Sequence, residues 1–441
     1  MKSIDFSKFE SLTNKSYIRH LGRVTRVVGL TIESLGPKVR MGGLCLIHSG
    51  IDKDSILAEV VGFKENKILL MPLGDLEGVG LGSTVEALGQ SLTVPVGDEL
   101  LGRVLDGLGN PIDNKEIIYT NTNYNIYSEP PDPLKRKRIK EVLPIGVKAV
   151  DGLLTIGKGQ RVGIFAGSGV GKSTLLGMIA RNTSADINVI ALIGERGREV
   201  KEFIERDLGK EGLKRSVVIV ATSDKPALVR QKAANTATAI AEYFRDQGKD
   251  VLLMMDSLTR FSMAQREIGL AIGEPPVSRG YTPSVFAVMP KLLERAGNAE
   301  TGSITGLYTV LVDGDDMNEP ITDTARGILD GHIVLSRKLA YKNHYPAIDI
   351  LQSVSRVMSE VAQEQHKNMA NQLKTVLATY KDVEDLINIG AYSKGNNEDI
   401  DYAIDKIKLV NDYLKQRTNE KFDFNEEINM MENIFIESSE A

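Results

Sequence analysis

The sequence predicts an α/β protein with a mainly parallel sheet, preceded by a small β-barrel and followed by a helical region. Three observations support this fold class. A glycine-rich turn joins an apolar run to a helix-like stretch within residues 161–195. Short apolar runs alternate with helical patterns from residue 150 to residue 357. Residues 21–94 contain closely spaced apolar runs, whereas residues 358–441 contain no strand-like run.

The composition is that of a globular protein made of more than one domain. At 441 residues the chain is long for a single core. A net charge of −5 argues against an extended nucleic-acid-binding face, which would appear as a basic excess. The single cysteine, Cys45, cannot form an intrachain disulfide, which indicates a reducing intracellular setting, and we expect it to be a small buried hydrophobe. No stretch resembles a signal peptide or a membrane-spanning helix, so we expect any role at a membrane to depend on docking.

We expect three parts, at residues 1–94, 95–357 and 358–441. In the first part, short apolar runs such as Val24–Val28 and Ala58–Phe63 recur between Gly, Pro, Asn and Asp, which is typical of a small barrel or sandwich. Such a barrel can bind oligonucleotides, but Phe63 is the only aromatic residue between Leu21 and Pro95. Because single-strand binders stack bases on aromatic side chains, a structural or ring-forming barrel is the better interpretation.

A junction follows at residues 95–146, and it contains the basic run Leu134–Lys140 (LKRKRIK). The run is either a solvated connector or a contact for nucleic acid. The acidic balance of the whole chain favours the connector.

The core region alternates apolar strand-like runs with helices such as Ala227–Phe244. This alternation predicts a site at the carboxyl ends of parallel strands, with helices on both faces of the sheet. The predicted strands are Val162–Phe165, Val189–Ile193, Val217–Ala221, Val251–Met255, Ile304–Val312 and Ile333–Leu335. In the last part of the chain, Ile400, Ile404, Ile407 and Leu414 recur at helical spacing.

The glycine-rich turn predicts a phosphate-binding loop. Glycines let successive backbone N–H groups converge on phosphate oxygens, and the following helix adds the positive end of its dipole. The first position of the usual pattern is Ala166, a small residue that still fits. Lys172 would reach the β- and γ-phosphates of a nucleoside triphosphate, and the Ser173 hydroxyl would ligate Mg²⁺. The loop residues are Gly167, Ser168, Gly169, Val170, Gly171, Lys172, Ser173 and Thr174.

Two carboxylates at predicted strand ends complete a hydrolytic site. Asp256 follows Val251–Met255 and is either a Mg²⁺ ligand or a helix cap. Glu195 follows Val189–Ile193 and is either a base for the attacking water, with Arg196 beside it, or a solvated charge at a helix start. The phosphate-binding loop favours the catalytic interpretation of both.

Several long motifs then reveal a resemblance. The strings GERGREV, MMDSLTRF, LLGRVLDGLGNPID and LQSVSR resemble the catalytic subunits of rotary F- and V-type ATPases. A closer similarity is to the ATPases of type III secretion, above all the flagellar protein-export ATPase, and it covers nearly the whole chain. It is carried by RVGIFAGSGVGKSTLLGMIAR, TATAIAEYFRDQGKDVLLMMDSLTRFSMAQREIGLAIGEPP and DGDDMNEPITDTARGILDGHIVLSR. The resemblance implies a RecA-like P-loop ATPase core with ATP and Mg²⁺.

The resemblance also implies roles for single residues. It makes Glu195 the general base and Asp256 the acid of the second nucleotide motif. It makes Arg356 an arginine finger that reaches a neighbouring subunit, although Arg356 could equally pair with a local carboxylate. Tyr345 matches an adenine-stacking tyrosine, or else it is a loop aromatic that covers the core. If one chain carries both Glu195 and Arg356, a ring of identical copies completes every site, so we expect a homohexamer.

The family further implies a cytoplasmic protein, peripheral at the inner face of the cytoplasmic membrane. Its expected partners are a stator-like regulator at the N-terminal segment, export chaperone–substrate complexes and a membrane export gate, with no nucleic acid. Its expected function is ATP hydrolysis that releases chaperones and feeds substrates to the gate. The alternatives are a virulence-type type III secretion ATPase, a hexameric RNA translocase, and a noncatalytic nucleotide-binding ring subunit.

Overall fold

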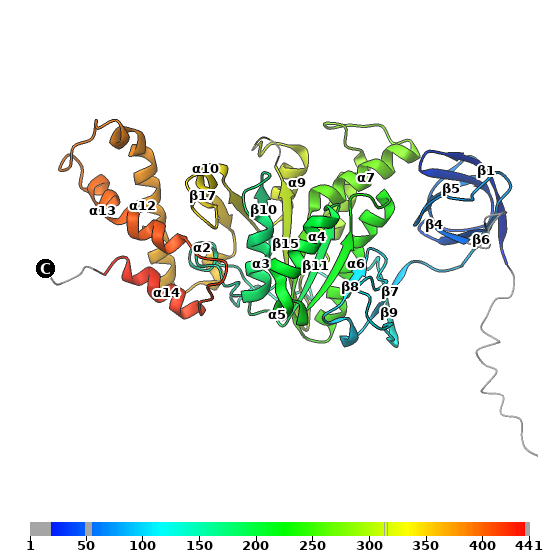
Figure 1. Cartoon of the computed structure of the whole chain (residues 1–441), viewed down its shortest axis with the longest axis horizontal. Coiled ribbons are helices and arrows are strands. Elements are labelled where there is room, and N and C mark those ends of the chain that lie inside the picture. Colours follow the sequence, from blue (N-terminus) through cyan, green and yellow to red (C-terminus); the bar gives the residue numbers. More distant parts are fainter. Residues whose placement is uncertain (1–18, 49–54, 313, 315, 437–441) are drawn as a thin grey trace, which may run out of the picture. The chain divides into compact units, whose positions relative to one another are not determined.

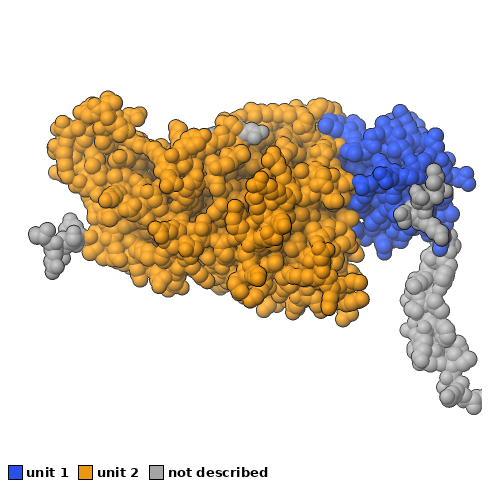
Figure 2. Space-filling view, in the orientation of Figure 1, with its two compact units in different colours: residues 1–92, 268–274 blue, residues 93–267, 275–441 orange. Residues whose placement is uncertain are grey.

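The computed structural model describes residues 19–48, 55–312, 314 and 316–436, so the predicted regulator-binding N-terminal segment lies outside it. The chain forms two compact units (Figure 2). One comprises residues 1–92 and 268–274, and the other comprises residues 93–267 and 275–441. The helical C-terminal region therefore belongs to the same unit as the α/β core.

The first unit contains the predicted barrel, which is closed. Its buried interior includes Val24, Ile32, Cys45 and Leu70. Burial raises the pKa of the Cys45 thiol to about 11, as expected for a buried hydrophobe rather than a nucleophile. Closure pairs every strand edge, which removes sites for edge-to-edge aggregation. The strand order is β1 (Leu21–Val28), β2 (Thr31–Leu35), β5 (Lys67–Pro72), β4 (Ser55–Lys64), β3 (Leu44–His48) and β6 (Thr84–Ala87).

The second unit is built on a nine-stranded sheet, which confirms the predicted α/β core (Figure 1). Neighbouring strands from β16 to β8 are parallel, whereas β17 is antiparallel to β16. The order is β17 (Ile348–Ser355), β16 (Gly331–Leu335), β10 (Arg161–Ala166), β15 (Ser303–Leu311), β13 (Asp250–Asp256), β11 (Ile187–Ile193), β12 (Ser216–Ala221) and β8 (Val104–Asp106), with β14 (Gly297–Asn298) beside β15. All central strands are apolar and buried on both faces, as parallel sheets require.

Helices cover both faces of this sheet. Helix α3 (Lys172–Asn182) shares a hydrophobic cluster with Ile190 and Leu192 of β11. Helix α6 (Ala227–Asp246) packs against β11, β12 and β13 but contributes no side chain to that cluster. Because alternate side chains of a strand point to opposite faces, the two helices lie on opposite sides, as the sequence predicted.

The remaining elements connect the strands of the sheet or lie beside them. They are β7 (Thr93–Val96), which pairs with β9 (Thr122–Asn125), the 3₁₀ turn η2 (Asp98–Leu100), α2 (Lys148–Leu153), α4 (Gly197–Glu202), the π-helical η3 (Phe203–Leu208), α5 (Gly209–Lys214), α7 (Leu258–Ile272), α8 (Pro283–Leu293), α9 (Pro320–Ile328), α10 (Arg337–Tyr341) and α11 (Met358–Val361).

Three helices form the C-terminal region: α12 (Glu364–Asn388), α13 (Glu398–Leu414) and α14 (Phe424–Asn433). Helices α12 and α13 pack together, and α14 packs on α2. Leu373, Val410 and Met431 belong to the same hydrophobic cluster as the sheet residue Ile333. The helices are therefore part of the main core. Among the described residues, no helix combines the length and apolar character that crossing a bilayer requires.

Candidate active site

The phosphate-binding loop connects the end of β10 to the start of α3. Gly169 and Gly171 have φ angles of 78° and 89°, in the left-handed region that favours glycine. No side chain caps the N-terminus of α3. Its first N–H groups are therefore available to phosphate oxygens. Ser168 and Gly169 are exposed at the tip of the loop, whereas Val170 is buried beneath it.

Lys172 lies between two carboxylates. Its Nζ atom is 2.5 Å from Oδ1 of Asp256 and 3.6 Å from Oε1 of Glu195. The three side chains are only 13%, 5% and 15% exposed, respectively. The sheet topology brings them together, because β10, β13 and β11 run parallel and end at the same edge. Residues separated by 84 positions in the sequence thus form one charged cluster.

The electrostatics of this cluster suit catalysis. Burial raises the pKa of Glu195 to about 7, and the neighbouring Asp256 charge acts in the same direction while Lys172 opposes it. Burial acts to lower the pKa of Lys172, but the attraction of Asp256 and Glu195 prevails and raises it. The ammonium therefore stays charged, and the glutamate is poised to exchange a proton near neutral pH.

Two residues that sequence reasoning did not single out complete the surroundings. Thr309 of β15 donates a hydrogen bond from Oγ1 to Oδ1 of Asp256 at 2.7 Å. The Arg260 side chain runs along Gly194, where an added Cβ would lie 2.9 Å from the arginine Cβ. The Arg260 Nε atom is buried and has no hydrogen-bond partner among the described residues. For Arg260, the only signal in the sequence was its position inside the MMDSLTRF motif.

Arg196 is not part of this cluster in the structure. Its ion-pair partner is Glu199, at 3.6 Å, and its side chain is 82% exposed. It occupies the N-cap position of α4, one residue after Glu195, and its side chain makes no capping hydrogen bond among the described residues. The backbone therefore keeps Arg196 near the site while its guanidinium points to solvent.

A cavity of about 620 Å³ opens beside the loop. Val170 and Gly171 line it on one side, and the half-exposed Tyr345 lies against Gly171. Residues 415–418 and 420 of the C-terminal region close the other side. The backbone N–H of Gln416 donates to the carbonyl of Tyr345 at 3.0 Å. The cavity has the position and volume for a nucleotide base, and its C-terminal wall was not predicted from the sequence.

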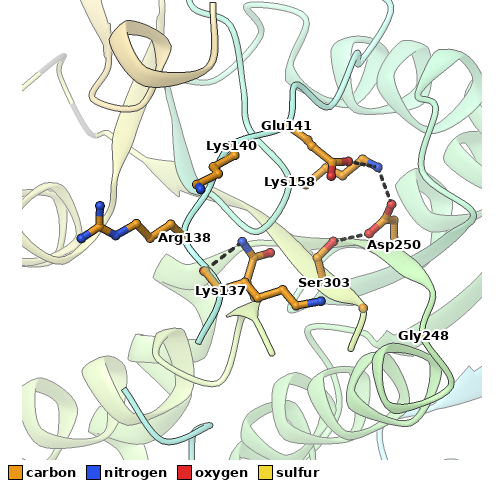
Figure 3. Close-up of a pocket in the computed structure, with 10 residues that line it drawn as sticks. Lys137, Arg138, Lys140, Glu141, Lys158, Gly248, Asp250 and Ser303 are labelled. Carbon is orange, nitrogen blue, oxygen red and sulfur yellow. Dashed lines mark hydrogen bonds and ion pairs between the residues drawn. The ribbon is translucent and has the colours of Figure 1, made fainter. Parts of the chain in front are cut away.

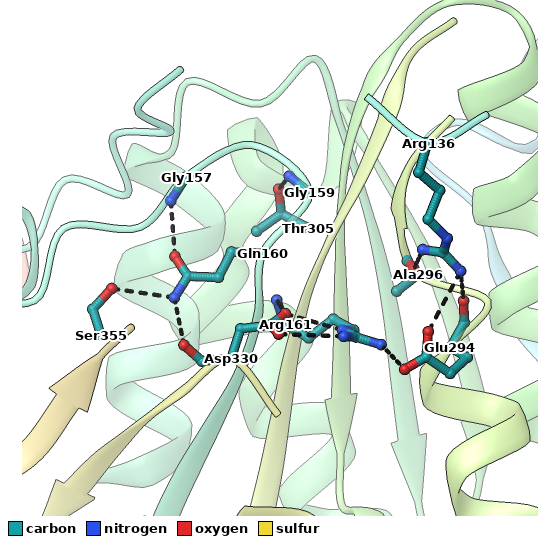
Figure 4. Close-up of polar contacts among 10 residues, drawn as sticks. All are labelled: Arg136, Gly157, Gly159, Gln160, Arg161, Glu294, Ala296, Thr305, Asp330 and Ser355. Carbon is teal, nitrogen blue, oxygen red and sulfur yellow. Dashed lines mark hydrogen bonds and ion pairs between the residues drawn. The ribbon is translucent and has the colours of Figure 1, made fainter. Parts of the chain in front are cut away.

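Arg356 lies at the opposite edge of the sheet from the phosphate-binding loop. Its backbone N–H donates to the carbonyl of Asp330, just before β16, at 3.0 Å. Its Nη2 atom donates to the carbonyl of Arg326 at 3.4 Å. Figure 4 shows the surrounding network at this edge, in which Gln160 bonds to both Asp330 and Ser355. The structure therefore does not bring Arg356 to the loop of its own chain.

The residues at the loop also fit a magnesium ion. The Ser173 hydroxyl in the first turn of α3 and the Asp256 carboxylate are oxygen donors of the kind that Mg²⁺ prefers. Among the described residues, no cluster of three His, Cys, Asp or Glu side chains could hold a metal alone. The donor set therefore suits an ion that takes its remaining ligands from water and nucleotide phosphates.

Comparisons with known proteins agree with this architecture along the chain. Residues 146–355 match the nucleotide-binding domain of the ATP synthase alpha/beta family, and residues 24–89 match its beta-barrel domain. Residues 362–433 match the T3SS EscN ATPase C-terminal domain.

Relatives that match over almost the whole chain agree with the same architecture. The flagellum-specific ATP synthase of Bacillus subtilis is 60% identical over 92% of both chains. The type 3 secretion system ATPase of Xanthomonas euvesicatoria is 54% identical over 91% of both.

Among solved structures, the assembled ATPase EscN from the enteropathogenic E. coli type III secretion system matches with a TM-score of 0.89 and 50% identity, covering 94% of this chain and 99% of EscN. EscN in complex with its central stalk EscO matches with a TM-score of 0.87 and 49% identity, with the same coverage. The P-loop site, the barrel and the C-terminal helices thus all have counterparts in one group of enzymes. This chain belongs to the family of type III secretion ATPases, which includes the flagellum-specific ATP synthases.

Proposed function

We propose that this protein hydrolyses ATP to energise flagellar type III protein export. The observation that carries the proposal is the contact of Lys172 with both Asp256 and Glu195 at the end of a phosphate-binding loop. The flagellar branch is favoured because the Bacillus subtilis flagellar relative is 60% identical, against 54% for the Xanthomonas euvesicatoria secretion ATPase. A virulence-type secretion ATPase is the second candidate.

In this mechanism Lys172 exchanges its carboxylate partners for the β- and γ-phosphates of ATP. Glu195 accepts a proton from the attacking water, a role that fits its raised pKa. Asp256 and Ser173 would hold Mg²⁺, and the bound ion would supply positive charge that stabilises the phosphates. Thr309 fixes the Asp256 carboxylate, and the Arg260 side chain runs along Gly194, the residue before Glu195. Exposed Arg196 would leave its ion pair with Glu199 to turn toward the γ-phosphate.

Each site is completed by a neighbouring copy in a homohexamer. Arg356 lies at the amino-terminal edge of the sheet. It therefore serves as an arginine finger for the nucleotide of the next subunit, and such a finger contributes roughly 10³–10⁵ in rate. Tyr345 stacks on adenine in the cavity beside Gly171.

The remaining assignments follow from this role. The enzyme works in the cytoplasm, where ATP is available, and docks peripherally at the inner face of the membrane on an export gate. Its partners are chaperone–substrate complexes, a stator-like regulator at the N-terminal segment, and a stalk of the kind seen with EscN. No nucleic acid is involved. Functional units at residues 1–94, 95–357 and 358–441 remain our proposed division.

Phosphate release from ATP by the purified full-length chain tests the proposal. Glu195→Gln should lower the rate by about 10²–10⁴-fold while ATP still binds, because it removes only the base. Glu205→Gln, a change at an exposed position, is the matched control and should retain full activity. No turnover in the wild type would make the chain a noncatalytic ring subunit, and stimulation by RNA would indicate a translocase.

The cellular role needs a separate measurement. Wild-type protein, but not Glu195→Gln, should restore flagellar export and swimming to a bacterium that lacks its flagellar ATPase. Restoration of injectisome secretion alone would favour the virulence-type assignment.

A further inference from the structure

A basic cleft of about 460 Å³ lies at the amino-terminal edge of the sheet, away from the phosphate-binding loop. Asp250 and Ser303, at the starts of β13 and β15, form one wall, and the segment 137–140 forms the rim (Figure 3). Every residue proposed to bind the nucleotide of its own chain lies at the other edge, and Arg356, proposed to act on a neighbouring copy, does not line this cleft. The cleft is therefore a separate site, and the proposed ATPase role assigns it no task.

The rim carries positive charge that no described carboxylate neutralises. Lys137, Arg138 and Lys140 are exposed, and none of them has an ion-pair partner among the described residues. Lys158, by contrast, lies 2.9 Å from Glu141 and 2.8 Å from Asp250. Cations thus outnumber carboxylates at this cleft, in a chain whose net charge is −5. Such a local excess attracts an anionic ligand.

The backbone that presents these cations is anchored. The Arg136 guanidinium donates to the carbonyls of Glu294 and Ala296 after α8 (Figure 4). Asn298 donates from Nδ2 to the carbonyl of Lys137 at 3.2 Å. Ile139 packs so closely on Gly157 that a Cβ there would lie 2.3 Å from its methyl group. The predicted solvated connector is thus an anchored segment with exposed charges, and these charges lose little backbone entropy on binding.

We propose that this cleft binds an acidic peptide segment of a partner protein. The cleft also contains two carboxylates, Glu141 and Asp250, and both pair with Lys158 (Figure 3). That mixture suits a peptide, which carries carboxylates together with neutral donors and acceptors, better than the uniform charge of a phosphate backbone. In the described part of the chain, no aromatic side chain lines the cleft for base stacking. Leu134, next to the rim in sequence, is 95% exposed and provides an apolar contact for such a peptide.

The position of the cleft predicts how a bound partner relates to ATP. The cleft lies at the starts of the strands, and the phosphate-binding loop lies at their ends, one full strand length away. An acidic peptide and a nucleotide therefore bind at the same time and do not compete.

Fluorescence anisotropy with the full-length protein tests this proposal. The probe is a fluorescein-labelled ten-residue peptide in which two acidic residues alternate with one leucine. The combined variant Lys137→Glu, Arg138→Glu and Lys140→Glu should weaken peptide binding at least about tenfold and keep wild-type basal ATP hydrolysis, because it leaves the nucleotide site intact. High salt should weaken binding to the wild type, and saturating ATP should not.

A matched control reverses the same number of charges elsewhere. Lys38, Lys210 and Lys408 are exposed, and the combined reversal of these three to Glu should leave peptide affinity within about twofold. Equal loss of affinity in both variants would overturn the proposal, because it would show attraction to overall charge. Tighter binding of a ten-nucleotide oligouridylate, lost in the cleft variant, would assign the cleft to nucleic acid instead. Failure of the cleft variant alone to self-associate would assign it to a neighbouring copy.

Discussion

Lys172 and Arg356 lie at opposite edges of one sheet. Lys172 follows β10, whose last residue, Ala166, pairs with Leu335. Arg356 follows Ser355, which pairs with the first residue of β16, Gly331. The two ends of β16 are about 13 Å apart at the rise of a parallel strand, and the phosphate-binding loop extends beyond that edge. An Arg356 that acts on a nucleotide therefore acts on the nucleotide of another copy.

Mixing two inactive variants should restore hydrolysis if the site is shared. Glu195→Gln and Arg356→Ala should each be strongly impaired alone. In an equal mixture, about a quarter of the interfaces in a randomly assembled ring pair an intact base with an intact finger. The rate of phosphate release should recover in proportion to the fraction of intact interfaces.

The matched control for this experiment mixes Glu195→Gln with Lys172→Ala. Both changes damage the same half of the site, so every interface is defective and no activity should return. Recovery in the control, or none in the first mixture although both variants assemble, would place Arg356 outside a shared site.

Specific activity should rise with protein concentration. Assembly supplies the arginine finger, so a dilute monomer lacks a contribution of roughly 10³–10⁵ in rate. Phosphate release per mole measured alongside light-scattering mass should show both increasing together. A monomer as active per chain as the assembled protein contradicts this prediction.

Tyr345→Ala should weaken ATP binding by about tenfold, because stacking of a base on an aromatic ring contributes about 1–3 kcal/mol. Tyr345→Phe keeps the ring and should bind ATP normally. Tyr341→Ala is the control, since this tyrosine is 85% exposed and does not line the cavity beside the loop. Titration with a fluorescent ATP analogue measures all three. Equal affinity of the alanine and phenylalanine variants at position 345 would exclude stacking.

The stability of the C-terminal region should fall as pH rises. Glu427 of α14 is fully buried next to the carboxyl group of Asp151. Burial raises the pKa of Glu427 from 4.5 to about 10, and the charge of Asp151 acts in the same direction while Lys148 opposes it. The folded state therefore holds a proton that the unfolded state releases. The contribution of this proton to the free energy of unfolding is complete below pH 4.5 and is lost as pH approaches 10.

Glu427→Gln keeps the shape of the protonated acid without its titration. Thermal denaturation should show a higher Tm than the wild type at about pH 9 and a similar Tm at about pH 5. The exposed Glu360→Gln change is the control and should not alter this pH dependence. If the Tm of Glu427→Gln changed between about pH 5 and about pH 9 by as much as the Tm of the wild type, another group would be responsible for the pH dependence.

Local sequence determined the parts of this protein that depend on neighbours in the chain. The run Val162–Phe165, the glycine-rich turn and the helix that begins at Lys172 are contiguous, so strand, loop and helix could be predicted together. The barrel and the C-terminal helices were likewise readable from the spacing of apolar residues. Asp256 and Glu195 could be located because each directly follows a buried apolar run.

Only the tertiary structure decided which of these residues meet. The sheet order places β15 and β13 between β10 and β11, and no local pattern encodes that order. It brings Thr309 to Asp256 and sends Arg356 to the far edge. The same long-range packing gathers the rim of Lys137 and Lys140 over the strand starts. Pairing between distant segments depends on the packing of the whole core, whereas the chemistry of a loop depends on a few consecutive residues.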